Sequence, residues 1–178
     1  MFDAKEEIEA YVRTLPIKSA FFSPSSFMQN FNTHTSPRPI GDGTYAITNL
    51  CHPTTELALI EPAADTGKWV GAMLAEPDKY AGQTFAAATR LYTWEEVVQT
   101  MSKVSGKTVL YKQVPDDVFK GFMPPALADT SVQMWQYVRD FGYYGAGQKE
   151  MVDWSAKQAR GQLTTLEEYL TKHPLNLQ

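Results

Sequence analysis

Short apolar runs alternate with helix-spaced segments over the first hundred residues, and this alternation most constrains the fold. The predicted strands are residues 18–23, 44–48, 56–60, 83–89 and 108–114. Strands that alternate with helices favour a parallel or mixed sheet, because a parallel pair needs a long crossover between its strands. The sequence therefore predicts an α/β fold. The remainder of the chain, which is richer in helical spacing, predicts a helical region toward the C-terminus.

Helix-start signals mark several helix boundaries. Thr93 with Glu96, and Thr165 with Glu168, have the spacing of a capping box, in which two side chains satisfy free N–H groups of the first turn. Ser25 or Ser26 is expected to cap a helical turn that runs through Asn30. The predicted helices cover residues 4–15, 62–74, 93–106 and 127–141, with a short one after 115 and a last one from 165. The inner stripe of the second helix is predicted to contain Trp69, Val70, Met73 and Leu74.

Charge and cysteine content exclude several classes of protein. The 178 residues suit one domain, and 16 Lys and Arg against 20 Asp and Glu give a net charge of −4. That balance argues against direct binding to nucleic-acid phosphates. The single cysteine, Cys51, excludes an intramolecular disulfide and a multi-cysteine metal site, and the three histidines lack ligand spacing. We find no signal peptide and no membrane-spanning run, so we expect a cytoplasmic protein.

Lys5 is the ionisable residue of most interest. On a helical wheel it lies beside Val12, at the border of the apolar stripe, from which its ammonium can reach a cleft. Partial burial there would lower its pKa and suit it to proton transfer. A surface lysine that lays its aliphatic stem over the core edge has the same spacing.

The glycines and aromatic residues near the C-terminus support weaker hypotheses. Residues 141–147 are rich in glycine but follow a predicted helix, whereas a dinucleotide-binding turn follows a strand, so we expect a connecting loop. Segment 32–43 is predicted to be another surface loop. An aromatic group has two readings, as core or as the wall of a ligand groove. It consists of Trp135, Tyr137, Phe141, Tyr143 and Tyr144.

Four further segments carry a family resemblance. They are Phe-Asp-Ala-Lys at 2–5 with Ile-Glu-Ala-Tyr at 8–11, Ser-Pro-Ser-Ser-Phe-Met-Gln-Asn-Phe at 23–31, Glu-Pro-Ala-Ala-Asp-Thr-Gly-Lys-Trp-Val at 61–70, and Pro-Asp-Lys-Tyr-Ala-Gly-Gln at 77–83. In this order and spacing they resemble the C-terminal half of the NmrA-like family of atypical short-chain dehydrogenases/reductases. The resemblance implies an incomplete Rossmann-type NAD(P)-binding fold over residues 1–178, with a helical C-terminal substrate-like region. The glycine-rich N-terminal dinucleotide-binding half is expected to be absent.

The resemblance also implies site residues. Lys5 matches a family lysine that reaches the ribose or nicotinamide region of the cofactor and serves proton transfer in the reductases. Asp65 matches a recurrent acidic position at a helix start, which we interpret as a cap. The family turn that lies against the nicotinamide end corresponds to Phe27, Met28, Gln29 and Asn30.

Two functions follow from the resemblance. The first is a redox-sensing, transcription-regulatory module of NAD(P)-binding type that lacks its own phosphate-binding loop. The alternative is the C-terminal portion of an NAD(P)H-dependent reductase acting on a small quinone- or enone-like substrate. An unrelated small α/β binding domain is a third reading of the residues alone.

The expected ligands and partners follow from the same comparison. The cofactor would be NADP(H) or NAD(H) in the full-length family, or none for a truncated chain. The partners would be a dinucleotide, a small molecule, a regulatory protein and a second copy of this chain, paired through an exposed sheet edge. We expect no direct contact with nucleic acid or membrane. A regulatory role would add the nucleus to the cytoplasm as a location.

Overall fold

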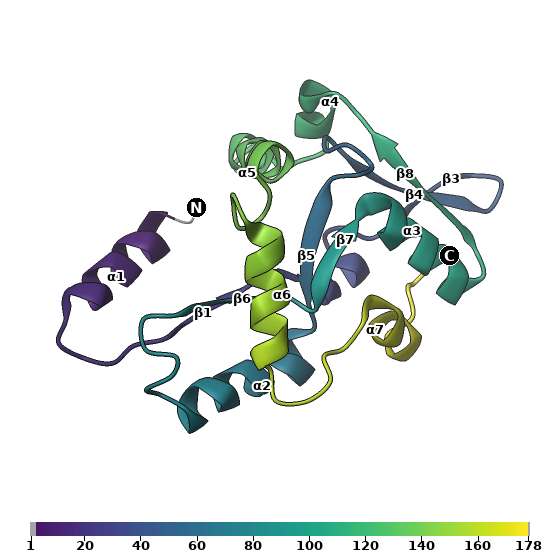
Figure 1. Ribbon diagram of the computed structural model, residues 1–178. Coiled ribbons are helices and arrows are strands. Elements are labelled where there is room, and N and C mark those ends of the chain that lie inside the picture. The colour runs from purple at the N-terminus through teal and green to yellow at the C-terminus, as the bar shows by residue number, and fades with distance from the viewer. Residues whose placement is uncertain (1–2, 178) are drawn as a thin grey trace.

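A computed structural model describes residues 3–177 of the chain (Figure 1), so Phe2, the first residue of the segments that carry the resemblance, lies outside the described residues. The strands are β1 (Phe21–Pro24), β2 (Ser26–Phe27), β3 (Arg38–Gly41), β4 (Thr44–Asn49), β5 (Glu56–Ile60), β6 (Thr84–Ala87), β7 (Arg90–Thr93) and β8 (Thr108–Gln113). The helices are α1 (Asp3–Thr14), the 3₁₀ turn η1 (Met28–Asn32), α2 (Pro62–Ala75), α3 (Trp94–Ser105), α4 (Asp116–Gly121), α5 (Ala128–Phe141), α6 (Gln148–Gln158) and α7 (Leu166–Lys172). The predicted α/β class is therefore confirmed.

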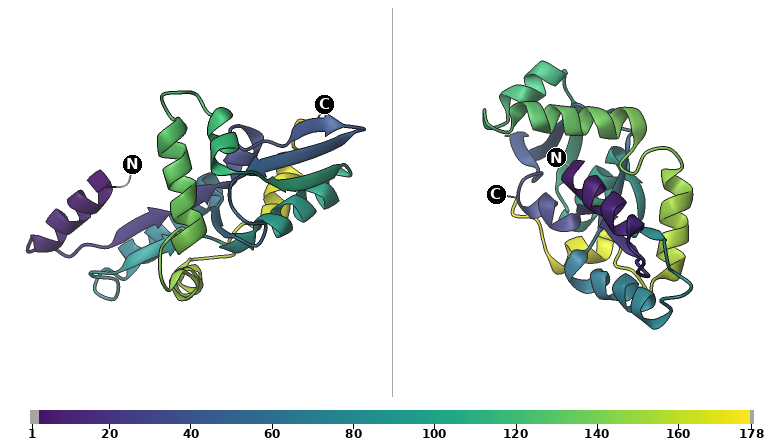
Figure 2. Two further views of the ribbon diagram at one scale, coloured as in Figure 1. Left: turned by 90° about the horizontal axis from the view of Figure 1, so that it is seen from above. Right: turned by 90° about the vertical axis from the view of Figure 1, so that its left-hand side faces the viewer.

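The described strands form three small sheets in which parallel pairing recurs. β1 pairs with β6 in parallel, and β5 lies between the parallel β2 and the antiparallel β7. In the third sheet, β4 lies between the antiparallel β3 and the parallel β8. α6 packs on β6 and β7, while α3 packs on β8 and α7. α1 extends from the body of the protein at the N-terminal end of the chain, as the views of Figures 1 and 2 agree.

Both predicted capping boxes are present. At the start of α3, the Glu96 N–H donates to Thr93 Oγ1 at 3.1 Å, and the Thr93 N–H donates to Glu96 Oε2 at 2.8 Å. Thr165 and Glu168 form the same pair of bonds at the start of α7. Gly106 ends α3 with a φ of +67°, a left-handed conformation that glycine adopts without strain.

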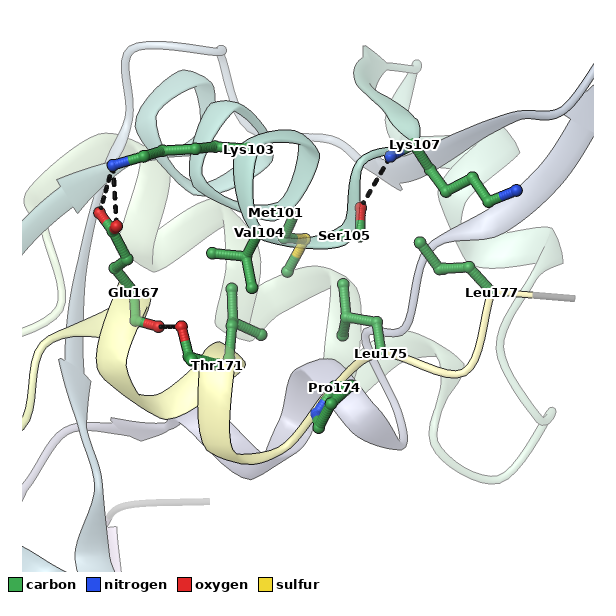
Figure 3. A pocket seen from close by; sticks show the side chains of 11 residues that line it. Met101, Lys103, Val104, Ser105, Lys107, Glu167, Thr171, Pro174, Leu175 and Leu177 are labelled. Atoms are coloured by element: carbon green, nitrogen blue, oxygen red, sulfur yellow. Dashed lines mark hydrogen bonds and ion pairs between the residues drawn. The ribbon is translucent and has the colours of Figure 1, made fainter.

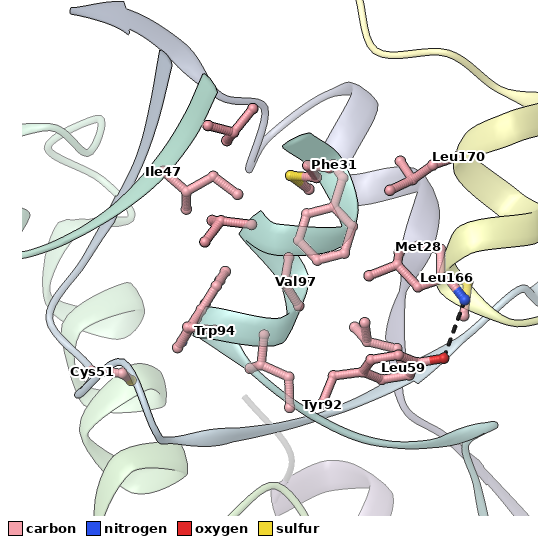
Figure 4. Packing of buried hydrophobic residues seen from close by; sticks show 14 of the residues in the cluster. Met28, Phe31, Ile47, Cys51, Leu59, Tyr92, Trp94, Val97, Leu166 and Leu170 are labelled. Carbon is pink, nitrogen blue, oxygen red and sulfur yellow. Dashed lines mark hydrogen bonds between the residues drawn. The ribbon is translucent and has the colours of Figure 1, made fainter. Parts of the chain in front are cut away.

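Two main apolar clusters hold the elements together. The larger cluster lies between the β2–β5–β7 sheet, α3 and α7, and Figure 4 shows Met28, Phe31 and Leu170 converging in it. The smaller cluster lies around Trp69, whose indole N–H donates to the Ser155 carbonyl at 2.9 Å and so ties α2 to α6. Met28 and Phe31 of η1 are buried in the larger cluster, so the core holds this turn in place.

Several expectations were wrong. Neither Ser25 nor Ser26 caps η1, because its N-cap is Phe27, which makes no side-chain cap bond. Leu74 is 77% exposed, and Ala72 takes the inner position on α2 because it lies one turn from Trp69. Segment 32–43 contains the strand β3, whose pairing with β4 orders what we expected to be a loop. The strand β7 and the helix α6 were not predicted.

Candidate functional site

The parallel pairing of β2 with β5 brings the predicted turn beside the start of α2. Ser26 pairs with Leu59 and Phe27 with Ile60, so η1 and Glu61 emerge side by side where both strands end. In open α/β sheets, ligands bind beyond the carboxyl ends of the strands. The register therefore places the predicted cofactor turn at the edge where such folds hold ligands.

The η1 turn is held in place by buried side chains and by hydrogen bonds of its last residue, Asn32. Met28 is fully buried and Phe31 is 3% exposed in the larger apolar cluster. At the end of the turn, Asn32 Oδ1 accepts from the Tyr169 hydroxyl at 2.8 Å, and Asn32 Nδ2 donates to the His173 carbonyl at 3.3 Å. These contacts fix the backbone of η1 before any ligand arrives.

Phe27 and Asn30 present the accessible part of the turn. The Phe27 side chain is 42% exposed, and Asn30 is partly exposed with its amide donating to Ser26 Oγ at 3.4 Å. A long hydrogen bond of this kind is weak and is readily exchanged for a ligand contact. The turn thus offers one aromatic face and one amide to the surface.

Glu61 orients Gln29 and was missed by sequence reasoning. Gln29 Nε2 donates to one carboxylate oxygen of Glu61, and the Ala64 N–H donates to the other, which makes Glu61 the N-cap of α2. Glu61 is 5% exposed. Because an ionised carboxylate only accepts, this contact fixes which end of the Gln29 amide faces it. Gln29 Oε1 is buried and has no donor among residues 3–177. The available signal was that Glu61 directly follows a predicted strand.

Lys5 lies on the exposed surface of α1. The hydrogen bonds from α1 to β6 and the residues before it come from further along the helix. Arg13 donates to the Gly82 carbonyl and to Thr84 Oγ1, both at 2.8 Å, and Glu9 accepts from the Thr84 hydroxyl at 3.2 Å. No hydrogen bond between described residues joins Lys5 to residues 27–30. Its assignment to the cofactor site stays a prediction.

Asp65 is a buried clamp and not a helix cap, which corrects the interpretation drawn from the resemblance. Its carboxylate is fully buried, accepting from Lys68 Nζ at 2.6 Å and from the Thr164 N–H at 2.9 Å and hydroxyl at 3.1 Å. Lys68 Nζ also donates to the Gln162 carbonyl at 2.5 Å. The cap role belongs to Glu61. Asp65 therefore fastens the segment before α7 to α2.

The glycine-rich segment connects two helices, as expected. Residues 142–147 join α5 to α6, and the Tyr144 hydroxyl donates to the Ser23 carbonyl at 2.8 Å, with Tyr143 donating to the Pro24 carbonyl at 3.4 Å. Burial raises the pKa of both phenols. The segment thus secures the end of β1.

The remaining aromatic residues of this group divide between the core and the surface. Trp135 packs against Trp94, with ring centres 5.7 Å apart. Tyr137 and Phe141 are 49% and 64% exposed and contact each other. The core reading is thus right for Trp135, and the role of the exposed Tyr137 and Phe141 as a ligand wall stays a prediction.

Cys51 and His52 form no catalytic pair. The Cys51 thiol donates to the Trp135 carbonyl at 3.4 Å, and burial raises its pKa to about 12. His52 Nδ1 is hydrogen-bonded to Thr54 Oγ1 at 2.8 Å instead. Within residues 3–177, no three His, Cys, Asp or Glu side chains gather as metal ligands, and no helix is long and apolar enough to cross a bilayer.

Comparison with known proteins finds a matching family and similar solved structures over most of this chain. The family model described as the NmrA-like family matches residues 1–170. The structure of NmrA, a negative transcriptional regulator in complex with NADP, superposes with a TM-score of 0.74 at 20% identity, covering 97% of this chain and 57% of that one.

Two reductases share the fold. Triphenylmethane reductase from Citrobacter sp., complexed with NADP(H), has a TM-score of 0.67 at 19% identity, covering 94% of this chain and 57% of that one. An NADPH-dependent quinone oxidoreductase from Escherichia coli has a TM-score of 0.64 at 16% identity, covering 96% and 60%. The chain thus spans under two thirds of the length of these solved structures.

Proposed function

Because the chain belongs to the NmrA-like family, we propose that it is an NAD(P)-binding module of the redox-sensing, transcription-regulatory type. The nicotinamide end of NADP(H) or NAD(H) would lie against the turn that Phe27, Met28, Gln29 and Asn30 form, in contact with Phe27 and Asn30 and with Met28 buried beneath them. The preformed η1 turn at the carboxyl ends of β2 and β5 is the observation that carries this proposal.

The state of the turn supports binding by preorganisation. Met28 and Asn32 are fixed by the core and by α7, so a ligand need not order this backbone when it binds. Sensing requires a difference in affinity between cofactor states, and it requires no proton transfer. The exposed position of Lys5, unlinked to the turn by hydrogen bonds, fits sensing better than catalysis.

We assign no described residue of this chain to the cofactor phosphates. The glycine-rich segment joins two helices, so it does not form the strand–helix turn that holds a pyrophosphate. The η1 turn would therefore contact only the nicotinamide half of the cofactor.

Calorimetric titration with NADPH and with reduced nicotinamide mononucleotide tests the proposal. We expect both to bind, because the contacts assigned here involve the half that they share. Asn30→Ala should weaken binding about twofold to tenfold, the range for one lost hydrogen bond. Gln99→Ala, an exposed amide on α3 away from the turn, is the matched control and should leave affinity unchanged. Equal effects of the two substitutions would refute the placement.

An NAD(P)H-dependent reductase is the second candidate. Two aromatic side chains lie near the end of β1. The Phe27 ring is exposed, and the Tyr143 hydroxyl donates to the Pro24 carbonyl. Aromatic rings of this kind suit a flat quinone- or enone-like substrate. A hydride-transfer assay over a panel of quinones and enals separates the two functions. Turnover that falls in Lys5→Ala would favour the enzyme, and dinucleotide binding without turnover would favour the sensor.

We also propose a protein partner for this module, either a regulatory protein or a second copy of this chain, in the cytoplasm or nucleus. Among residues 3–177, β1 pairs with one strand, β6, and its Ser23 and Pro24 carbonyls otherwise accept from tyrosine hydroxyls, so one strand edge is without a strand partner and is a template for another chain. Beside it, α1 exposes Ile8 by 59% and Tyr11 by 65%. Light scattering after size-exclusion chromatography should find a dimer that Ile8→Glu, which places a charge on this exposed face, converts to monomer.

A further inference from the structure

A second pocket lies away from the η1 turn, between the end of α3 and the segment that follows α7 (Figure 3). Its volume is about 420 Å³, within the range of small-molecule sites. Met101 and Leu170 are buried at its base, and Val104 and Leu175 line it as partly buried side chains. The floor is thus apolar over most of its length.

The two ends of this pocket carry different charge. At one end, Lys103 Nζ is paired with both oxygens of Glu167 at 2.8 and 2.9 Å, so its charge is neutralised. Lys107 lies at the other end, near Leu177 (Figure 3), and forms no ion pair with any residue in 3–177. Beside it, Ser105 Oγ accepts the Lys107 backbone N–H, which leaves the hydroxyl proton free to donate.

We propose that this pocket binds an amphipathic carboxylate, with its apolar part against the partly exposed Val104, Leu175 and Leu177 and its carboxylate at Lys107. The α3 C-terminus carries partial negative charge that would oppose an anion, and the ammonium of Lys107, which directly follows Gly106 at the end of the helix, offsets it. An ammonium at one end of an apolar floor selects a ligand that has one negative head group and one apolar tail.

Methyl-detected NMR titration of the full chain with decanoate, kept below its micelle-forming concentration, tests the proposal. We expect saturable shifts at the methyl groups of Leu170, Leu175 and Leu177. Decyltrimethylammonium has a similar tail and the opposite charge, so it should bind at least about fivefold more weakly. Acetate, which has the head group without the tail, should cause no saturable shift at these methyls.

Charge reversal at the pocket provides the second arm. Lys107→Glu should weaken decanoate binding at least about fivefold, because it replaces attraction by repulsion. Lys107 is exposed, so the variant should fold, and an unchanged methyl spectrum without ligand verifies this. Lys157→Glu, an equally exposed lysine on α6, is the matched control and should leave affinity unchanged.

Four outcomes would overturn the proposal. Equal binding of decanoate and decyltrimethylammonium would show that Lys107 selects nothing, as would unchanged affinity in Lys107→Glu. Shifts confined to methyl groups outside the pocket would place the ligand elsewhere. Shifts of the pocket methyls that depend on protein concentration in the absence of ligand would identify a second copy of the chain as the occupant.

Discussion

Removal of the Asp65 carboxylate should destabilise the fold more than removal of any exposed acid. Asp65→Ala leaves the Thr164 N–H without its acceptor and the Lys68 ammonium without its charged partner. Loss of one partner of a buried pair costs about 3–5 kcal/mol. The Lys68 side chain is 26% exposed and regains some hydration, so we expect a loss near the lower end, about 3 kcal/mol.

Urea unfolding followed by far-UV circular dichroism measures this loss. Asp78→Ala is the control, because Asp78 pairs with Lys18 on the surface, where the two side chains are 80% and 68% exposed. Such a pair contributes at most about 1 kcal/mol. Asp65→Asn, which keeps an acceptor for Thr164, should fall between them. If Asp65→Ala and Asp78→Ala lower the free energy of unfolding equally, the clamp does not hold the segment before α7.

Further predictions follow from burial and capping. The buried Cys51 thiol, with a pKa of about 12, should resist iodoacetamide at mildly alkaline pH until urea unfolds the chain, and mass spectrometry would show early labelling if this is wrong. Thr93→Ala should cost about 1 kcal/mol by loss of the capping box, whereas Thr93→Ser should cost little; equal losses on denaturation would count against the cap. Burial raises the pKa of Tyr111 and Tyr144, so the folded state keeps protons that the unfolded state releases above about pH 10. The free energy of unfolding should therefore be retained below that pH and fall as pH rises beyond it. Urea midpoints measured above that pH, with phenolate absorbance reporting tyrosine ionisation, check this; a midpoint that does not fall would contradict the burial of these phenols.

Local signals in the sequence were sufficient for most elements. The strand at 56–60 and both capping boxes depend on residues within a few positions of each other, so their pattern is complete in a short window. α6 escaped notice because few of its residues are buried: Val152 and Ser155 are buried while Lys149 and Asp153 are exposed. Its apolar stripe is too sparse to indicate a helix.

The site depends on pairings that a single sequence does not contain. Gln29 contacts Glu61 because β2 and β5 lie in parallel register, and Asp65 contacts Thr164 across 99 positions of the chain. An acidic residue in the first helical turn has the same pattern whether it caps the helix or clamps a distant segment. Only the fold distinguishes the two roles of Glu61 and Asp65.

A structure of this chain crystallised with NADPH tests the central claim most directly. The account predicts the nicotinamide ring in contact with the η1 turn beyond the ends of β2 and β5, beside Phe27 and Asn30. A dinucleotide seated elsewhere on the protein, with Phe27 and Asn30 free of any ligand contact, would contradict it.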